Sequence, residues 1–236
     1  RWRSSDAAMT TPFRVIDTGL RGGRANIAFD QALIEARLDD AIPDTIRFLA
    51  FRPSALVGRH QDLSLEIDLE CCRARGVEVA RRITGGGAIY FDPGQLGWEL
   101  VFRRRSLPFA DLAAAAKAIC EAAAAGLSGL GIDARFLPRN DIEVDGRKLC
   151  GTGGFFEDDV LFYQGTLLID TDPAAMAEVL KVPRAKLVKR GLDDVRQRVV
   201  TLGELLGETL PDMAAIQGAL LNGFSRGLGI DAAWGA

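Results

Sequence analysis

Three consecutive glycines, Gly85 to Gly87, lie between two stretches of strand-forming residues in the first half of the chain. Residues 77–82 predict one strand and residues 88–91 another, so the glycines form their connection. Because glycine has no Cβ atom, the backbone can approach a ligand closely there and turn its N–H groups inward. Arg82, just before the glycines, can add a charge-assisted hydrogen bond. The pattern indicates a loop that binds phosphate or carboxylate oxygens, with a plain flexible hairpin loop as the alternative.

A second polar stretch runs from Asn140 to Gly151. Within it Asp145-Gly146 predicts a two-residue hairpin, because Asp-Gly tolerates the positive backbone angles of a tight primed turn. Lys148 then lies on the return strand, where a fixed ammonium can offset the repulsion between a carboxylate and a phosphate. Asp141 is suited to hold Mg²⁺ on the same phosphates, because hard cations prefer carboxylate oxygen. The alternatives are that Lys148 is a solvated charge and that Asp141 caps a turn.

The hydrophobic pattern along the whole chain is that of a mixed α and β protein. Further strands are expected at residues 13–17, 45–51, 55–58, 96–102, 142–149 (as a hairpin) and 160–169, and helices at residues 25–37, 109–127, 173–180 and 210–228. Strands dominate the first two thirds and helices the end, without internal repeats, which predicts an α+β fold. We expect residues 13–236 to form a single domain, and residues 1–12 to be disordered or a remnant of expression.

Composition excludes several classes of protein. The formal net charge of -3 provides no basic excess, so no nucleic-acid partner is expected. No apolar run approaches the roughly 18 residues of a membrane-spanning helix, which predicts a cytoplasmic protein without a membrane partner. A single histidine and the absence of a Gly-x-Ser-x-Gly motif argue against a serine hydrolase. The four cysteines match neither a zinc-ligand pair nor a dithiol redox motif.

Two more motifs accompany the glycine loop and the lysine hairpin: Gly58-Arg59-His60-Gln61 upstream and Gln164-Gly165-Thr166-Leu167-Leu168 downstream. Together the four motifs resemble those of the biotin/lipoate protein ligase family, on its lipoate-protein ligase branch. The resemblance implies a mixed β-sheet flanked by helices, with lipoate or octanoate lying in an apolar slot. It also implies that ATP, with Mg²⁺, converts the acid into an acyl-adenylate. The acyl group is then transferred to a lysine of a lipoyl-carrier protein, either a lipoyl domain or a protein like the glycine-cleavage H protein.

The resemblance also assigns site residues by position. Lys148 corresponds to the catalytic lysine that contacts the acyl-adenylate. Asn140 and Asp141 fall at the ATP positions, with Asp141 as the magnesium ligand. Arg198 matches a late Arg-Val segment of the family, and an exposed helix charge explains it equally well. The positions that bind lipoate and the acyl-adenylate are Arg82, Gly85, Gly86, Gly87, His60, Gly165 and Thr166.

The chain departs from the family pattern in places that bear on the substrate. Phe91 and Gln164 stand where the family commonly has histidine, and Gly97-Trp98 replaces its usual polar pair. These changes reshape the acyl slot, so both lipoate and octanoate stay open as substrates. Full-length ligases also tend to carry a C-terminal accessory domain of about 90 residues. Too few residues follow Val199 for that domain, so we expect either a separate accessory subunit or a member that works without one.

Two other functions stay open. Octanoyl and lipoyl transferases share this fold and carry the acyl group as a cysteine thioester without ATP. Cys150 fits this role if it shares a strand face with Lys148, because a nearby ammonium lowers a thiol pKa. The other explanation is that Cys150 is a small buried residue, and the transferases' own cysteine often lies near residues 162–164, where this chain has none. A non-catalytic binding module is the third function, although such a scaffold has no need of Lys148 facing a glycine loop.

Overall fold

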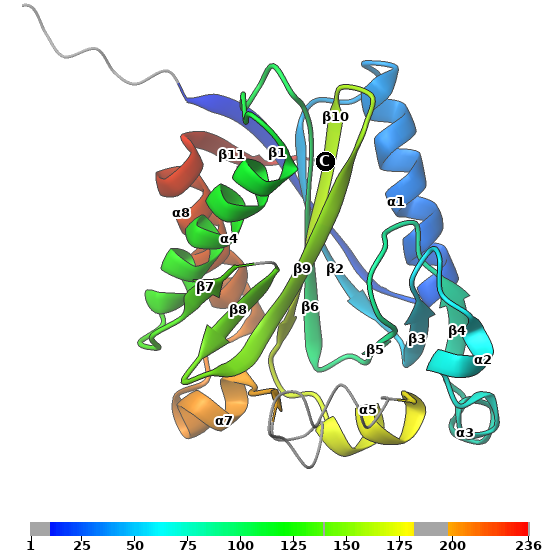
Figure 1. Cartoon of the computed structure of the whole chain (residues 1–236). Coiled ribbons are helices and arrows are strands. Elements are labelled where there is room, and N and C mark those ends of the chain that lie inside the picture. The colour runs from blue at the N-terminus through cyan, green and yellow to red at the C-terminus, as the bar shows by residue number, and fades with distance from the viewer. Residues whose placement is uncertain (1–9, 139, 182–197, 236) are drawn as a thin grey trace, which may run out of the picture.

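The computed structural model describes residues 10–138, 140–181 and 198–235 (Figure 1). An eight-stranded sheet has the order β11-β1-β2-β6-β10-β9-β8-β7, and a three-stranded sheet has the order β4-β3-β5. β1 pairs in parallel with β2 and β11, whereas β2, β6, β10 and β9 pair antiparallel, so the large sheet is mixed. The strands are β1 (Thr11–Arg21), β2 (Thr45–Phe51), β3 (Ser54–Val57), β4 (Glu78–Arg81), β5 (Ile89–Phe91), β6 (Gln95–Arg103), β7 (Arg135–Leu137), β8 (Asp141–Val144), β9 (Arg147–Glu157), β10 (Val160–Leu168) and β11 (Ile230–Trp234).

Helices cover both faces of the large sheet, which confirms the predicted α+β fold. Figure 1 shows α4 and α8 side by side on one face and α1 on the other. Successive residues of β6 serve the two faces in turn. Leu100 and Phe102 join the core under α4 and α8, whereas Val101 packs with Leu33 and Ile34 of α1. The helices are α1 (Gly23–Leu38), α2 (Leu63–Glu66), α3 (Leu69–Arg75), α4 (Leu112–Ser128), α5 (Pro173–Val179), α7 (Leu202–Leu206) and α8 (Met213–Leu228).

The pairing of α4 with α8 follows from local sequence. Each helix begins after an aspartate, Asp111 or Asp212, whose side chain accepts a hydrogen bond from a first-turn N–H. The two backbones then approach closely at glycines: a Cβ atom at Gly223 would lie 2.2 Å from the carbonyl oxygen of Ala122. No helix in the described ranges combines the length and the hydropathy needed to cross a membrane.

Most predicted elements are present, with modest differences at their ends. The predicted strand at residues 45–51 is β2, and the predicted hairpin turns at Asp145 and Gly146, with φ angles of 51° and 75°. β1 begins at Thr11, so the segment expected to lack structure overlaps a strand there, and residues 1–9 lie outside the described ranges. β7 and β11 are not predicted from the sequence, because both are short and lack strand periodicity.

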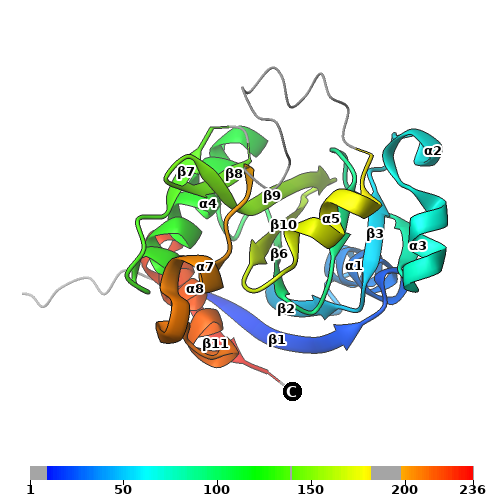
Figure 2. The same cartoon turned by 90° about the horizontal axis from the view of Figure 1, so that it is seen from below.

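The two sheets lie next to each other, and the glycine loop connects β4 to β5 of the small sheet. Figure 2 shows β9 and β10 of the large sheet near β3 of the small sheet, with α5 beside them. A hydrogen bond of 3.1 Å from the Gln164 side chain on β10 to the Thr84 hydroxyl links the sheets at the loop. The glycine loop and the lysine hairpin are thereby brought together.

Candidate active site

The glycine loop is held in shape by the buried guanidinium of Arg82. Arg82 donates hydrogen bonds to the carbonyl oxygens of Gly85 and Gly87, at 2.6 and 2.7 Å, and to the Thr84 hydroxyl at 3.0 Å. Burial lowers the pKa of Arg82 to about 10, so the side chain stays cationic at neutral pH. The sequence predicts an anion contact for Arg82. In the structure the side chain also fixes the loop, and its charge lies beside the adjoining cavity.

The loop also rests on the turn that follows β3. A Cβ atom at Gly58 would lie 2.1 Å from the carbonyl oxygen of Gly86, so only glycine allows this approach. Gly86 itself has a φ angle of 95°, which a side chain would strain. The N–H group of Arg59 donates to the carbonyl oxygen of Thr84 at 3.0 Å. Residues 58–61 therefore support the loop. The His60 side chain is exposed and lines none of the cavities of the site.

Lys148 on β9 forms an ion pair with Asp141 on β8. The Lys148 ammonium lies 2.7 Å from one carboxylate oxygen of Asp141, and the Arg198 guanidinium lies 3.6 Å from the other. The Lys148 side chain crosses Gly151, since a Cβ atom there would lie 2.5 Å from the ammonium nitrogen. The N–H group of Val200 donates to the Lys148 carbonyl oxygen at 2.9 Å, which brings Arg198 to the same place.

A chain of hydrogen bonds, partly exposed at Asn140 and buried at its other end, holds Asn140 beside Asp141. The Thr152 hydroxyl donates to the carbonyl oxygen of Asn140 at 3.0 Å, and the Asn140 amide donates to the carbonyl oxygen of Thr152 at 2.9 Å. Behind them the Tyr163 hydroxyl lies 2.8 Å from the Thr152 hydroxyl and 3.2 Å from the Cys120 sulfur. This chain ties the start of β8 to β9 and β10.

Two connected cavities meet at Lys148. The loop cavity, of about 310 Å³, is bordered by the three loop glycines and by Asn140, Thr152 and Gln164. Three cationic side chains and one acidic side chain line it: Arg82, Lys148, Arg198 and Asp141. The α5 cavity, of about 170 Å³, is mainly apolar and is bordered by Ile89, Tyr90, Leu168, Met176, Leu180 and Val199. The excess of positive charge suits the loop cavity to phosphate or carboxylate.

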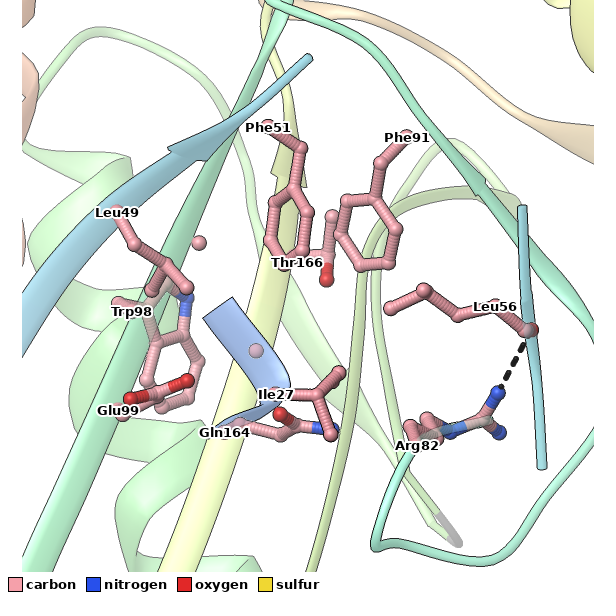
Figure 3. Close-up of a pocket in the computed structure, with 12 residues that line it drawn as sticks. Ile27, Leu49, Phe51, Leu56, Arg82, Phe91, Trp98, Glu99, Gln164 and Thr166 are labelled. Atoms are coloured by element: carbon pink, nitrogen blue, oxygen red, sulfur yellow. Dashed lines mark hydrogen bonds between the residues drawn. The ribbon is translucent and has the colours of Figure 1, made fainter. Parts of the chain in front are cut away.

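A third, nearly filled cavity lies between the large sheet, at β2, β6 and β10, and residues of α1, β3 and β5 (Figure 3). This slot joins the loop cavity through Arg82, Gln164 and Thr166, which line both. Its free volume is about 10 Å³. The apolar side chains around it are Ile27, Leu49, Phe51, Leu56, Phe91 and Trp98.

Cys150 points away from the site. β8 and β9 pair with a β-bulge, in which Glu143 faces Lys148 but Ile142 faces Cys150, so Lys148 and Cys150 do not share a strand face. The prediction from their spacing of two is therefore wrong. Cys150 is fully buried in the main core, and desolvation raises the pKa of its thiol to about 12. None of the four cysteines lines the loop cavity, the α5 cavity or the slot.

Comparison with known proteins gives the family. Residues 23–225 match the model of the lipoyl protein ligase A/B catalytic domain. The chain belongs to this family. The catalytic domain is 30% identical to octanoyltransferase LipM of Symbiobacterium thermophilum, over 94% of this chain and 88% of that protein. It is also 30% identical to lipoate-protein ligase LplJ of Bacillus subtilis, over 79% of this chain, but it spans only 55% of that ligase.

Solved structures of lipoate-protein ligases have the same fold as this catalytic domain. A bi-partite lipoate protein ligase from Thermoplasma acidophilum, described with its E2 lipoyl domain, superposes with a TM-score of 0.80 at 27% identity, covering 96% of this chain and 87% of that one. A lipoate-protein ligase A bound with ATP also gives a TM-score of 0.80, at 26% identity, covering 96% of this chain and 89% of that one. These matches confirm the predicted biotin/lipoate ligase fold and the lipoate-ligase branch of the family.

The lipoyl ligase catalytic domain gathers nearly all residues assigned from the sequence. Gly165 lines the slot and Thr166 lines all three cavities, whereas His60 stays outside them. Thr84 and Thr152 were not predicted as site residues, because an isolated threonine in a loop or on a strand is ordinary. The predicted residues that line the loop cavity are Arg82, Gly85, Gly86, Gly87, Asn140, Asp141, Lys148, Thr166 and Arg198.

Proposed function

We propose that this chain is an ATP-dependent lipoate-protein ligase. It activates lipoate or octanoate as an acyl-adenylate and transfers the acyl group to a lysine of a lipoyl-carrier protein. The observation that carries the proposal is the content of the site: a lysine, an aspartate and two arginines around the glycine loop, and no cysteine. Such a set can hold two anions together but offers no thiol for a covalent acyl intermediate.

Lys148 has the central role in this proposal. It lines both the loop cavity and the α5 cavity, so one ammonium can contact the carboxylate of the acid and the α-phosphate of ATP. Attack of one anion on another is slowed by their repulsion, and a fixed cation between them offsets it in the transition state. In the structure Asp141 holds Lys148 at 2.7 Å and fixes its direction.

The connected cavities offer separate places for the two substrates, the carboxylic acid and ATP. The slot is enclosed mainly by apolar side chains and suits a hydrocarbon chain, which needs no hydrogen bonds. The α5 cavity borders β5, the outermost strand of the small sheet, where a heteroaromatic base can add hydrogen bonds. We place the acyl chain in the slot, the base in the α5 cavity and the phosphates in the loop cavity between them.

Magnesium fits Asp141 only together with the nucleotide. In the described ranges no three His, Cys, Asp or Glu side chains come together as a metal cluster. Mg²⁺ in nucleotide sites is usually held by one or two carboxylates with the phosphates and water completing its shell, so Asp141 is a sufficient protein ligand. Bound there, the ion would supply charge neutralisation on the phosphates. Asn140, held by Thr152, keeps Asp141 beside the loop.

We predict that Thr152→Val raises the KM for ATP about three- to tenfold. It should also lower the free energy of unfolding by about 1–3 kcal/mol, because the buried Tyr163 hydroxyl loses one of its partners. The hydroxyl bond to Asn140 is lost while the strand pairing stays, and a net hydrogen bond of this kind is worth about 1 kcal/mol. Steady-state kinetics of pyrophosphate exchange gives the value. Thr152→Ser should restore the KM, and a valine variant with an unchanged KM would show that the bond has no role in positioning Asn140.

The similarity to LipM supports octanoyl transfer through a cysteine thioester as the second candidate function. The environment of Cys150 argues against it. A thiol with a pKa of about 12 is ionised in roughly one molecule in 10⁵ at pH 7, and the sulfur faces the core. Cys72 and Cys120 are also buried, and burial raises the pKa of each thiol. Cys71, which is half-buried on α3, lines none of the three cavities.

We predict that Cys150→Ser retains ATP-dependent lipoylation within about threefold of the wild type. Serine keeps the size of the side chain, but a hydroxyl cannot replace a thiolate nucleophile without a dedicated base. The test incubates each protein with lipoate, MgATP and a lipoyl domain and measures the mass of the domain. A dead serine variant, together with a hydroxylamine-sensitive acyl adduct mapped to Cys150 of the wild type, would establish the transferase instead.

The partners in this proposal are a lipoyl-carrier protein and, where transfer requires it, a separate accessory subunit. The support is the Thermoplasma ligase, which is described as bi-partite and with its E2 lipoyl domain. The chain spans 48% of a Staphylococcus aureus lipoate-protein ligase, so almost half of that relative has its counterpart here. Assays of transfer should therefore be run with and without a candidate accessory protein.

A further inference from the structure

The walls of the slot form a small hydrophobic cluster of their own. Its buried members are Leu49, Phe51, Leu56 and Phe91, which are separate from the main core under α4 and α8. They pack so closely that about 10 Å³ of free volume is left, roughly the space of one water molecule. An acyl chain can therefore enter only if a wall residue moves.

The contact that closes the slot is a ring stack between the two sheets. The rings of Phe51 and Phe91 lie 4.1 Å apart at their centroids, with an interplanar angle of 24°. Figure 3 shows the two rings face to face at one end of the slot, with Thr166 beside them. Phe51 ends β2 of the large sheet, whereas Phe91 lies on the three-residue β5 at the edge of the small sheet.

The large sheet that borders the slot has no room to give way. A Cβ atom at Gly165 would lie 2.1 Å from the Trp98 ring, so this ring already lies directly on the backbone of β10. Leu49 likewise lies on Gly97, where a Cβ atom would be 2.7 Å from its side chain. The Trp98 ring belongs to the main core, where it packs against Phe224 of α8, and Leu49 lies on the central strand β2. This leaves Phe91, on a short edge strand, as the wall residue that can move.

We infer that Phe91 sets the length of acyl chain that the slot accepts. The inference rests on the proposed function, because it takes a carboxylic acid with a hydrocarbon chain as the substrate. A short straight-chain acid can end at the mouth of the slot, where Arg82, Gln164 and Thr166 join it to the loop cavity, and it leaves the Phe51–Phe91 stack in place. A chain of octanoyl or lipoyl length separates the two rings, and breaking such a stack lowers an equilibrium constant about two- to tenfold. Phe91 thereby favours shorter chains over longer ones.

The test measures binding without requiring chemistry. Trp98 lines the slot and serves as a fluorescence reporter once Trp2 and Trp234 are replaced by phenylalanine. Butanoate, hexanoate, octanoate and lipoate are titrated into this protein and into its Phe91→Ala and Phe91→Leu variants. Phe109→Leu is the matched control, because Phe109 also stacks in an aromatic pair, with Phe102, but lies away from the slot.

We expect the ratio of Kd for octanoate to Kd for hexanoate to fall about two- to tenfold in Phe91→Ala, and to fall in the same direction but less in Phe91→Leu. Lipoate should follow octanoate, and Phe109→Leu should keep the parent ratio. The leucine variant decides the question if the alanine variant does not fold. An unchanged ratio in folded variants would overturn the inference. If the acids bind but none stimulates pyrophosphate exchange, the proposed function fails while the inference on Phe91 stands.

Discussion

Replacing Lys148 by alanine should lower the rates of adenylate formation and of acyl transfer at least 100-fold. The ammonium lies where the loop cavity and the α5 cavity meet, with Asp141 holding it at 2.7 Å. Removing one preorganised electrostatic contact of this kind typically costs 10²- to 10³-fold in rate. Arg198 also lines both cavities, but its guanidinium lies 3.6 Å from the other carboxylate oxygen of Asp141 and does not occupy the place of the ammonium.

The loss in Lys148→Ala should leave the fold intact. Lys148 is partly exposed and Arg198 remains beside Asp141, so the loss of the ion pair should lower the free energy of unfolding without preventing folding. Lys117→Ala is the matched control, since Lys117 is an exposed lysine on α4 with one ion pair, to Glu121. Pyrophosphate exchange and thermal unfolding are measured on all three proteins. A folded Lys148→Ala protein with a normal rate of exchange would exclude Lys148 from the mechanism.

Gly58→Ala should also reduce activity strongly, by about 10- to 100-fold. The added methyl group would lie 2.1 Å from the carbonyl oxygen of Gly86, and backbone cannot be displaced without moving the loop. A shift of about 1 Å at a substrate-positioning element can cost 100-fold in rate. The effect should appear in both KM and kcat, because the loop contacts both substrates in our proposal.

A glycine that has space for a methyl group provides the comparison for Gly58. Gly218, in the middle of α8, has no atom within 4 Å of an added Cβ, and alanine is favoured over glycine in a helix. Gly218→Ala should therefore be fully active and at least as stable as the parent. If Gly58→Ala matches it in activity, the loop does not need its support from the turn after β3.

The sequence predicted the fold well where the patterns were long. The alanine-rich helix that starts after Asp111 and the strand at residues 45–51 follow from periodicity and capping, which act locally. β11 could not be predicted in this way. Its five residues form a strand because β1 offers an unpaired edge, and such a partner exists only after the chain has folded.

The site was predicted by its motifs, and the structure explains the parts that motifs cannot give. The glycines and Lys148 carry their chemistry in their residue types, so spacing was enough to find them. The orientation of Cys150 depends on a β-bulge, and a one-residue shift moves a side chain to the other face of a strand. The second function of Arg82, holding loop carbonyl groups, likewise depends on burial and not on sequence.

Acid-dependent exchange of labelled pyrophosphate into ATP tests the central claim most directly, because only a reversible adenylation step produces it. The wild-type protein is incubated with ATP, Mg²⁺ and labelled pyrophosphate, with or without lipoate or octanoate, and with a candidate accessory protein in a parallel set. We predict exchange that requires the acid and that Lys148→Ala abolishes. No exchange with any acid of this class in either set, alongside octanoyl transfer from a carrier protein without ATP, would contradict the account.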